Sequence, residues 1–128
     1  MRVLVCGGRG FKSRGIVCRT LCSLRPFPTL IIHGGCSGAD KLAAEWAWEY
    51  EVTAVEFPAE WDKYGRAAGP IRNQSMIDAG KPDVVVAFAG GRGTADMIRR
   101  ATKAGVRIIE VPISFLCWRC GKEIKLED

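Results

Sequence analysis

The sequence has no long hydrophobic run: no apolar stretch among its 128 residues approaches the roughly 20 that a membrane-spanning helix needs. The apolar part of the N-terminal segment, residues 2–6, is too short for a signal peptide, so we expect a cytoplasmic protein that makes no membrane contact. There is one histidine, His33, and no spacing of Ser, His and Asp residues supports a catalytic triad. No run of about five like charges occurs, which argues against a charged tail.

The net charge of +5 suits an anionic partner. Because the arginines are spread along the chain, we favour a local anion pocket with an ordinary solvated surface. A nucleic-acid surface is a weaker alternative, supported only by the basic balance.

Six cysteines occur without an export signal, which favours thiols or metal ligands over disulfides. Cys6 ends an apolar segment, and Cys18 and Cys22 share one face of a predicted helix, so all three are expected in the core. Cys117 and Cys120 form a CxxC, which is half of a zinc ribbon. A structural zinc there would need ligands from elsewhere or from a second chain; otherwise the pair is two free thiols at the end of the chain.

Apolar segments alternate with helical patterns along residues 1–111, and residues 112–128 form a C-terminal tail that carries the CxxC. Near-continuous apolar strands indicate burial on both faces and therefore a parallel sheet covered by helices. We predict an α/β, Rossmann-like, doubly wound parallel sheet of about five strands in the order 3-2-1-4-5, with helices on both faces. The predicted strands are residues 2–6, 29–33, 52–57, 83–88 and 106–111. The predicted helices are residues 11–25, 37–50, 70–79 and 94–104, with a long loop over 59–69.

Three glycine-rich turns follow the first, second and fourth predicted strands, and each opens a predicted helix. Glycine lets a ligand approach the backbone closely, and a helix N-terminus favours negative charge. In the predicted sheet, these turns lie at the edge where such folds bind ligands. The residues expected to bind a phosphate-bearing ligand are Gly7, Gly8 and Arg9 in the first turn, Gly34, Gly35, Ser37 and Gly38 in the second, and Gly90, Gly91, Arg92, Gly93 and Thr94 in the third.

Among the other side chains near these turns, Asp40 and His33 have two interpretations each. Asp40 either meets ribose hydroxyls or only complements the dipole of its helix, for which Ser37 is the expected N-cap. His33 either touches the ligand or is a packed, hydrogen-bonded core residue. Asp96 is expected in the first turn of its helix.

The loop over 59–69 and the following helix supply aromatic and basic side chains. Trp61 or Tyr64 could stack on a base, while Arg66 and Arg72 hold a phosphate or ribose. The alternative is that Trp61 covers core and the arginines are solvated. Dinucleotide binding of the NAD type is not indicated, because the first turn lacks the G-x-G-x-x-G pattern and no acidic residue closes the second strand.

Residues 31–40 (IIHGGCSGAD), residues 69–73 (GPIRN) with Met76, and residues 89–97 (AGGRGTADM) resemble the SLOG superfamily, in particular its small YspA-like proteins of bacteria and phages. The resemblance covers roughly residues 1–111. It implies a Rossmann-like fold that binds nucleotides or nucleotide-derived ligands, and it implies a homodimer.

Some SLOG relatives, the LOG-type phosphoribohydrolases, release a free base from a nucleoside monophosphate and carry P-G-G-x-G-T-x-x-E with an upstream arginine. The resemblance matches Arg72 to that arginine, but Ala89 replaces the proline and Met97 the glutamate. In a hydrolase, Asp96 or Asp40 would have to stabilise the ribosyl cation while Arg72 positions the phosphate. We therefore expect a sensor or sequestering module for a nucleotide or ADP-ribose-like molecule that needs no cofactor, with a nucleotide N-glycosidase as the alternative.

Overall fold

The structure, a computed structural model, describes residues 1–111, 114–116 and 123–125, and it contains one five-stranded parallel sheet. The strand order is β3-β2-β1-β4-β5, as predicted, and every pairing in this sheet is parallel. β6 (Ser114–Leu116) and β7 (Glu123–Lys125) form a separate antiparallel pair. The strands of the main sheet are β1 (Arg2–Cys6), β2 (Leu30–His33), β3 (Thr53–Glu56), β4 (Val84–Phe88) and β5 (Arg107–Val111).

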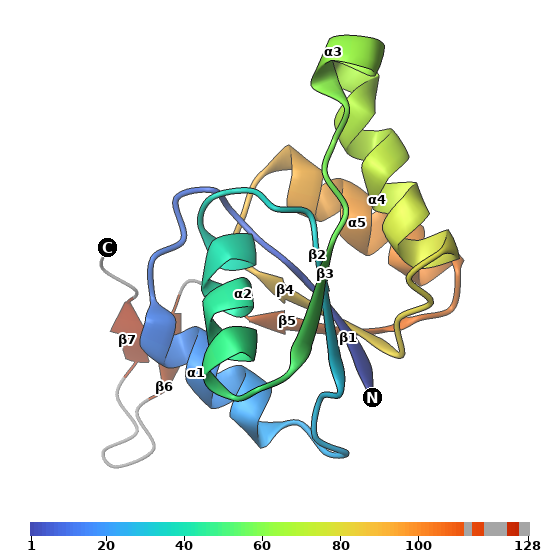
Figure 1. Cartoon of the computed structure of the whole chain (residues 1–128). Helices are drawn as coiled ribbons and strands as arrows, with labels where there is room; N and C mark the ends of the chain where they lie inside the picture. The colour runs from blue at the N-terminus through green and yellow to red at the C-terminus, as the bar shows by residue number, and fades with distance from the viewer. Residues whose placement is uncertain (112–113, 117–122, 126–128) are drawn as a thin grey trace.

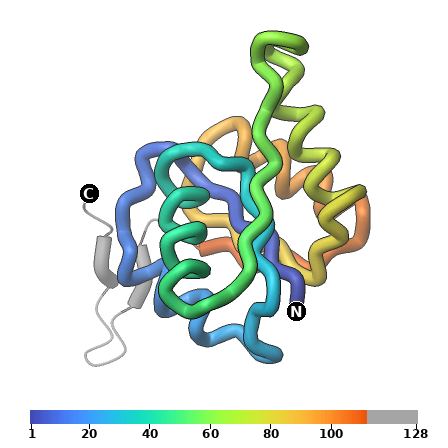
Figure 2. The backbone as a smooth tube through the Cα atoms, viewed as in Figure 1, coloured from blue at the N-terminus to red at the C-terminus, as the bar shows by residue number. Residues whose placement is uncertain are grey.

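Helices cover both faces of the sheet (Figure 1). α1 (Arg14–Ser23) and α2 (Ala39–Glu49) pack on one face, and α4 (Ala68–Asp78) and α5 (Arg92–Lys103) pack on the other. The short α3 (Trp61–Tyr64) and a 3₁₀ turn (Gly65–Ala67) precede α4. The backbone between β3 and α4 projects beyond the rest of the fold (Figure 2).

Alternation along the central strands divides the core into two layers, because successive side chains of a strand point to opposite faces. Val3 and Val5 of β1 belong to the cluster beneath α1 and α2, and Leu4 and Cys6 belong to the cluster beneath α4 and α5. β4 is buried at all five positions. The doubly covered sheet thus explains the unbroken apolar runs of β1 and β4.

The register places the ends of β1 and β4 side by side, since Cys6 pairs with Ala87. β1 also pairs with β2, so the turns that leave β1, β2 and β4 emerge at one edge of the sheet. This is the point where the strand order reverses, and it is where open α/β sheets bind ligands.

All four predicted helix starts differ from the observed ones by two or three residues. α2 begins at Ala39 with Gly38 as its N-cap, so Ser37 does not cap it; the Ser37 hydroxyl instead donates to the Arg9 carbonyl at 3.4 Å. α5 begins at Arg92, two residues earlier than predicted, so Gly93 lies in its first turn although glycine is a poor helix former. Asp96 consequently lies in the second turn of α5 rather than the first.

The segment 59–69 is largely helical rather than a long loop. α4 begins at Ala68, before Pro70, which the first turn tolerates because its amide would have no partner within the helix. The same helix ends at Asp78, with Ala79 as its C-cap. α1 is shorter than predicted and begins after Ser13, whose hydroxyl accepts a hydrogen bond from the Ile16 amide at 3.4 Å.

Candidate functional site

The three glycine turns meet around Gly8. The Gly8 amide donates to the Ala89 carbonyl at 2.9 Å, and the Gly8 carbonyl accepts from the Ala39 amide at 3.3 Å. A Cβ on Gly38 would overlap the Gly8 carbonyl, and one on Gly90 would lie 2.6 Å from the Gly8 nitrogen. Glycine is therefore required at these positions so that the turns can pack against one another.

Gly91 and Gly93 differ, because a Cβ at either would meet nothing within 4 Å. Both line a cavity of about 580 Å³ at the carboxyl edge of the sheet. Gly91 is the N-cap of α5, and no side chain caps this helix end. The first amides of a helix have no partner within it, so the N-terminus of α5 presents N–H groups and the positive end of the helix dipole beside the cavity.

Four arginines line the cavity: Arg9, Arg66, Arg72 and Arg92. Arg72 is held most firmly, because its guanidinium donates to the Gly34 carbonyl at 2.8 Å and to the Phe57 carbonyl at 3.4 Å. Arg72 thereby joins α4 to the ends of β2 and β3, and its position is fixed by the protein itself.

Trp61 forms part of the cavity wall and is 48% exposed. The guanidinium of Arg9 lies over the Trp61 indole, 5.9 Å from the ring centroid. A flat aromatic surface at the rim of a cationic cavity is suited to stacking on a planar ring.

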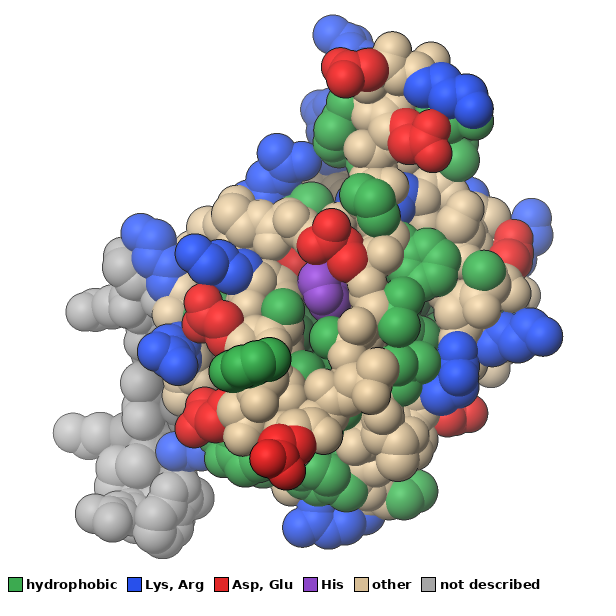
Figure 3. Space-filling model, viewed as in Figure 1, with side chains coloured by type: hydrophobic (Ala, Val, Ile, Leu, Met, Phe, Trp, Pro, Cys, Tyr) green, Lys and Arg blue, Asp and Glu red, His purple; other side chains and the backbone are tan. Residues whose placement is uncertain are grey.

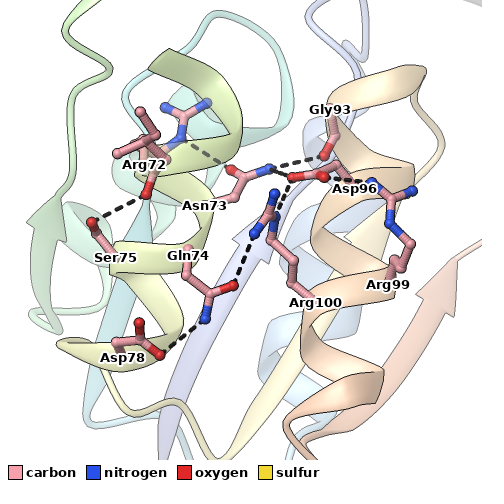
Figure 4. Close-up of polar contacts among 10 residues, drawn as sticks. Arg72, Asn73, Gln74, Ser75, Asp78, Gly93, Asp96, Arg99 and Arg100 are labelled. Atoms are coloured by element: carbon pink, nitrogen blue, oxygen red, sulfur yellow. Dashed lines mark hydrogen bonds and ion pairs between the residues drawn. The ribbon is translucent and has the colours of Figure 1, made fainter. Parts of the chain in front are cut away.

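Asp96 also lines the cavity, and both of its carboxylate oxygens are occupied (Figure 4). Oδ1 accepts from Arg99 at 2.6 Å, and Oδ2 accepts from Arg100 at 2.8 Å and from Asn73 at 3.0 Å. Burial alone would raise the pKa of Asp96, but the hydrogen bonds from Arg100 and Asn73 and the charges of both arginines outweigh it and lower this pKa. Asn73 also donates to the Gly93 carbonyl at 3.2 Å and so ties α4 to the third glycine turn.

The Asp40 side chain stabilises the second glycine turn by hydrogen bonding to its backbone. Its Oδ2 accepts from the amides of Gly34 at 3.0 Å and Cys36 at 3.3 Å. Burial raises the pKa of Asp40, although these two hydrogen bonds and the nearby His33 and Arg72 oppose the shift. His33 is buried behind the same turn, where its Nδ1 accepts from an amide of the turn at 3.1 Å. Burial also lowers the pKa of His33, which favours its neutral form.

The structure brings most of the predicted residues together. The large cavity is lined by Gly7, Gly8, Arg9, Asp40, Arg66, Arg72, Gly91, Arg92, Gly93, Thr94 and Asp96. A smaller cavity of about 270 Å³ lies next to it and is lined by Gly34, Gly35 and Ser37, with Arg9, Cys36, Trp61 and Arg72 shared between the two. His33, Gly38 and Gly90 instead support the turns by packing and hydrogen bonding.

Further lining residues were not predicted as site residues: Cys6, Cys36, Gly69, Pro70, Asn73 and Met76. Asn73 and Met76 lie one and four positions after Arg72, so their place on the same helix as that arginine was the available signal. Cys117 and Cys120 lie outside the described residues. Among residues 1–111 and the two short strands that follow, no group of three or more His, Cys, Asp or Glu side chains is arranged to hold a metal ion.

Comparison with known proteins gives two matches by sequence. A model of the YspA, cpYpsA-related SLOG family matches residues 1–64, half of the chain. The Gene 61 protein of Mycobacterium phage D29 is 39% identical, in a match that spans 84% of this chain and 94% of the phage protein. The chain belongs to the YspA, cpYpsA-related SLOG family. In this SLOG protein, no helix of the described part of the chain is long and apolar enough to cross a membrane.

Among solved structures, UDP-GlcNAc 2-epimerase from Neisseria meningitidis, bound to UDP-GlcNAc, is similar with a TM-score of 0.49 and 12% identity. The match covers 93% of this chain and 34% of the epimerase, so the SLOG chain spans about a third of that protein's length. A likeness this distant carries no argument about function.

Proposed function

We propose that this SLOG protein binds a nucleotide or a nucleotide-derived small molecule, as a sensor or sequestering module. One observation carries the proposal: the uncapped N-terminus of α5 and four arginines border the same open cavity. A volume of about 580 Å³ lies within the range of small-molecule sites.

The charges of the site favour an anion. The arginines at 9, 66 and 92 line the cavity, whereas the Asp96 carboxylate is neutralised by Arg99 and Arg100. Phosphate oxygens would be bound by the first amides of α5 and by Arg92, because helix N-termini and guanidinium groups are both strong phosphate partners. Trp61 would then stack on the base.

The hydrolase alternative has less support. Met97, which stands where LOG-type enzymes have glutamate, is completely buried in the core. Asp96 lies at the cavity, but a carboxylate paired with two arginines has little negative charge left to stabilise a ribosyl cation. Asp40 is the remaining carboxylate at the cavity, and its Oδ2 is engaged by two amides.

A nucleic-acid surface has less support as well. On the face shown in Figure 3, Lys and Arg side chains are scattered and interspersed with acidic ones rather than gathered into one patch. Self-association remains a proposal that rests on the SLOG resemblance, and light scattering of the purified protein tests it.

The decisive experiment combines native mass spectrometry of the purified protein with calorimetric titration of nucleoside mono- and diphosphates and ADP-ribose. Gly91→Val should abolish binding, because its side chain would fill the cavity beside the first amides of α5 without a clash in the empty protein. Gly10→Val is the matched control. A Cβ at Gly10 also meets nothing within 4 Å, but Gly10 is not among the residues that line the cavity.

Equal affinity in the wild type and Gly91→Val would contradict the proposed site. Chromatography of the same mixtures separates the two functions: intact ligand supports a binding module, whereas released free base supports the N-glycosidase. Binding of DNA in place of these ligands, with an affinity that falls steeply with salt, would overturn both.

A further inference from the structure

Two thiols lie in contact on α1, away from the cavity described above. Cys18 and Cys22 are four residues apart, which places them on the same face of the helix. Their sulfur atoms are 3.8 Å apart, and both side chains are only partly buried at the edge of the core.

Polar donors surround this pair. The indole Nε1–H of Trp46 donates to the Cys22 sulfur at 3.4 Å, and the Tyr50 hydroxyl lies 3.4 Å from the Cys18 sulfur. The Arg25 guanidinium is also near, because it donates to the Cys22 carbonyl at 2.8 Å. Hydrogen-bond donors and a cation stabilise a thiolate over a thiol.

The pKa of Cys22 is accordingly lowered. Burial alone would raise it, but the hydrogen bonds from Trp46, Tyr50 and Cys18 and the charge of Arg25 outweigh that effect. Cys6 shows the opposite environment in the same protein, because burial and the charge of Asp40 raise its pKa to about 12.

We propose that Cys18 and Cys22 form a redox-active dithiol that a peroxide oxidises to a disulfide. The Cys22 thiolate attacks one peroxide oxygen, the O–O bond breaks, and hydroxide leaves and takes up a proton to form water (or an alcohol from an organic peroxide). Cys22 is then a sulfenic acid. The Cys18 sulfur attacks the Cys22 sulfur, the S–O bond breaks, and a second water leaves with the Cys18 proton. The two thiols supply the two electrons that reduce the peroxide.

The location of the pair on α1 permits this reaction. A disulfide needs the sulfurs about 2.05 Å apart, so they must approach each other from their present contact distance. α1 ends at Ser23, one residue after Cys22, so only its last turn has to adjust. Neither cysteine lines the large cavity, and the inference therefore stands independently of the proposed ligand.

Peroxide treatment of the reduced full-length chain tests the inference. After oxidation and blocking of the remaining thiols, cleavage after Arg19 separates the two cysteines unless a disulfide joins them, so peptide mass spectrometry reports the cross-link directly. We expect the cross-linked pair in the wild type, its loss on treatment with a dithiol reductant, and a sulfenic acid trapped on Cys22 by dimedone in Cys18→Ser.

Trp46→Phe is the second variant, because it removes the indole donor to Cys22 and keeps an aromatic ring at this buried position. It should slow the oxidation several-fold, and Cys6 should stay unmodified in every sample. The inference is overturned if the wild type forms no cross-link under conditions that oxidise free glutathione. It is also overturned if Cys22→Ser leaves the rate of Cys18 oxidation unchanged.

Discussion

The side-chain amide of Asn73 on α4 donates a 3.0 Å hydrogen bond to Asp96 on α5, and the same amide also donates to the Gly93 carbonyl at 3.2 Å. One side chain thus joins the helix that carries Arg72 to the turn that begins α5. The network extends beyond the cavity through Arg100, which donates to Gln74 at 2.9 Å (Figure 4).

Asp96→Asn should destabilise the fold by about 1–2 kcal/mol at pH 7, because Arg99 and Arg100 lose a charged partner. The lowered pKa of Asp96 sets the sign of the pH dependence: the carboxylate stabilises the native state above its unfolded pKa of about 3.9, and this stabilisation is lost as the pH falls through the native value. Chemical denaturation of both proteins between about pH 3 and about pH 7 should show a difference in the free energy of unfolding that shrinks as the pH falls. A constant difference would mean that the charge of Asp96 does not stabilise the fold.

Asp40→Asn should show the opposite trend. Burial raises the pKa of Asp40, so the native state favours the protonated form, and the stabilisation that protonation provides is lost as the pH rises through the native pKa. An asparagine oxygen can still accept from the Gly34 and Cys36 amides without a buried charge. The stability of the variant relative to the wild type should therefore rise as the pH increases above about 4. A relative stability that falls over that range would contradict the assignment.

Gly90→Ala and Gly91→Ala should behave differently although the residues are adjacent. A Cβ on Gly90 would overlap the Thr94 hydroxyl and the backbone at Gly8, whereas one on Gly91 meets open space. We expect Gly90→Ala to lose about 1–3 kcal/mol of folding free energy and Gly91→Ala to stay within about 0.5 kcal/mol of the wild type. Urea denaturation measures both, and equal losses would mean that the third turn does not pack as described.

Trp61→Ala should weaken ligand binding by about fivefold or more, because stacking of a base on an aromatic ring contributes about 1–3 kcal/mol. Trp48→Ala is the matched control: Trp48 is 88% exposed on α2 and lies outside the residues that line the large cavity. Calorimetric titration of the two variants with one nucleotide gives the comparison. Equal effects of the two substitutions on affinity would mean that the base does not stack on Trp61.

Arg72→Ala should reduce both stability and affinity, whereas Arg9→Ala should reduce mainly affinity. Removing Arg72 deprives the Gly34 and Phe57 carbonyls of a donor, which costs about 1–2 kcal/mol. Arg9 is exposed and contacts the Trp61 ring, an interaction of about 0.5–1 kcal/mol at such sites. Denaturation and titration of each variant separate the two contributions.

The sequence predicted the strand order and the meeting of the three glycine turns because both follow from local patterns. Unbroken apolar runs such as β4 require burial on both faces, and right-handed crossovers then leave few topologies. The sequence could not show which glycines serve packing. Gly38 and Gly91 look alike in their turns, and only the tertiary contact of Gly38 with the Gly8 carbonyl distinguishes them.

The roles of the acidic residues were beyond sequence reasoning for the same reason. Asp96 is close in sequence to Arg99 and Arg100, but its third partner, Asn73, comes from another helix. The start of α5 at Arg92 was missed because glycine is a poor helix former, and here the close packing of the preceding turn overrides that preference.

α3 has no buried residue, and it supplies the Trp61 wall of the cavity. Another wall is the start of α5, where Thr94, Asp96 and Met97 are buried and Met97 packs into the core beside the sheet. One wall of the cavity is therefore held by buried residues, while the other is an exposed segment that turns at Gly65. We therefore expect the phosphate end of a bound ligand to meet a preformed surface, and its ring to meet an exposed side chain that can adjust to it.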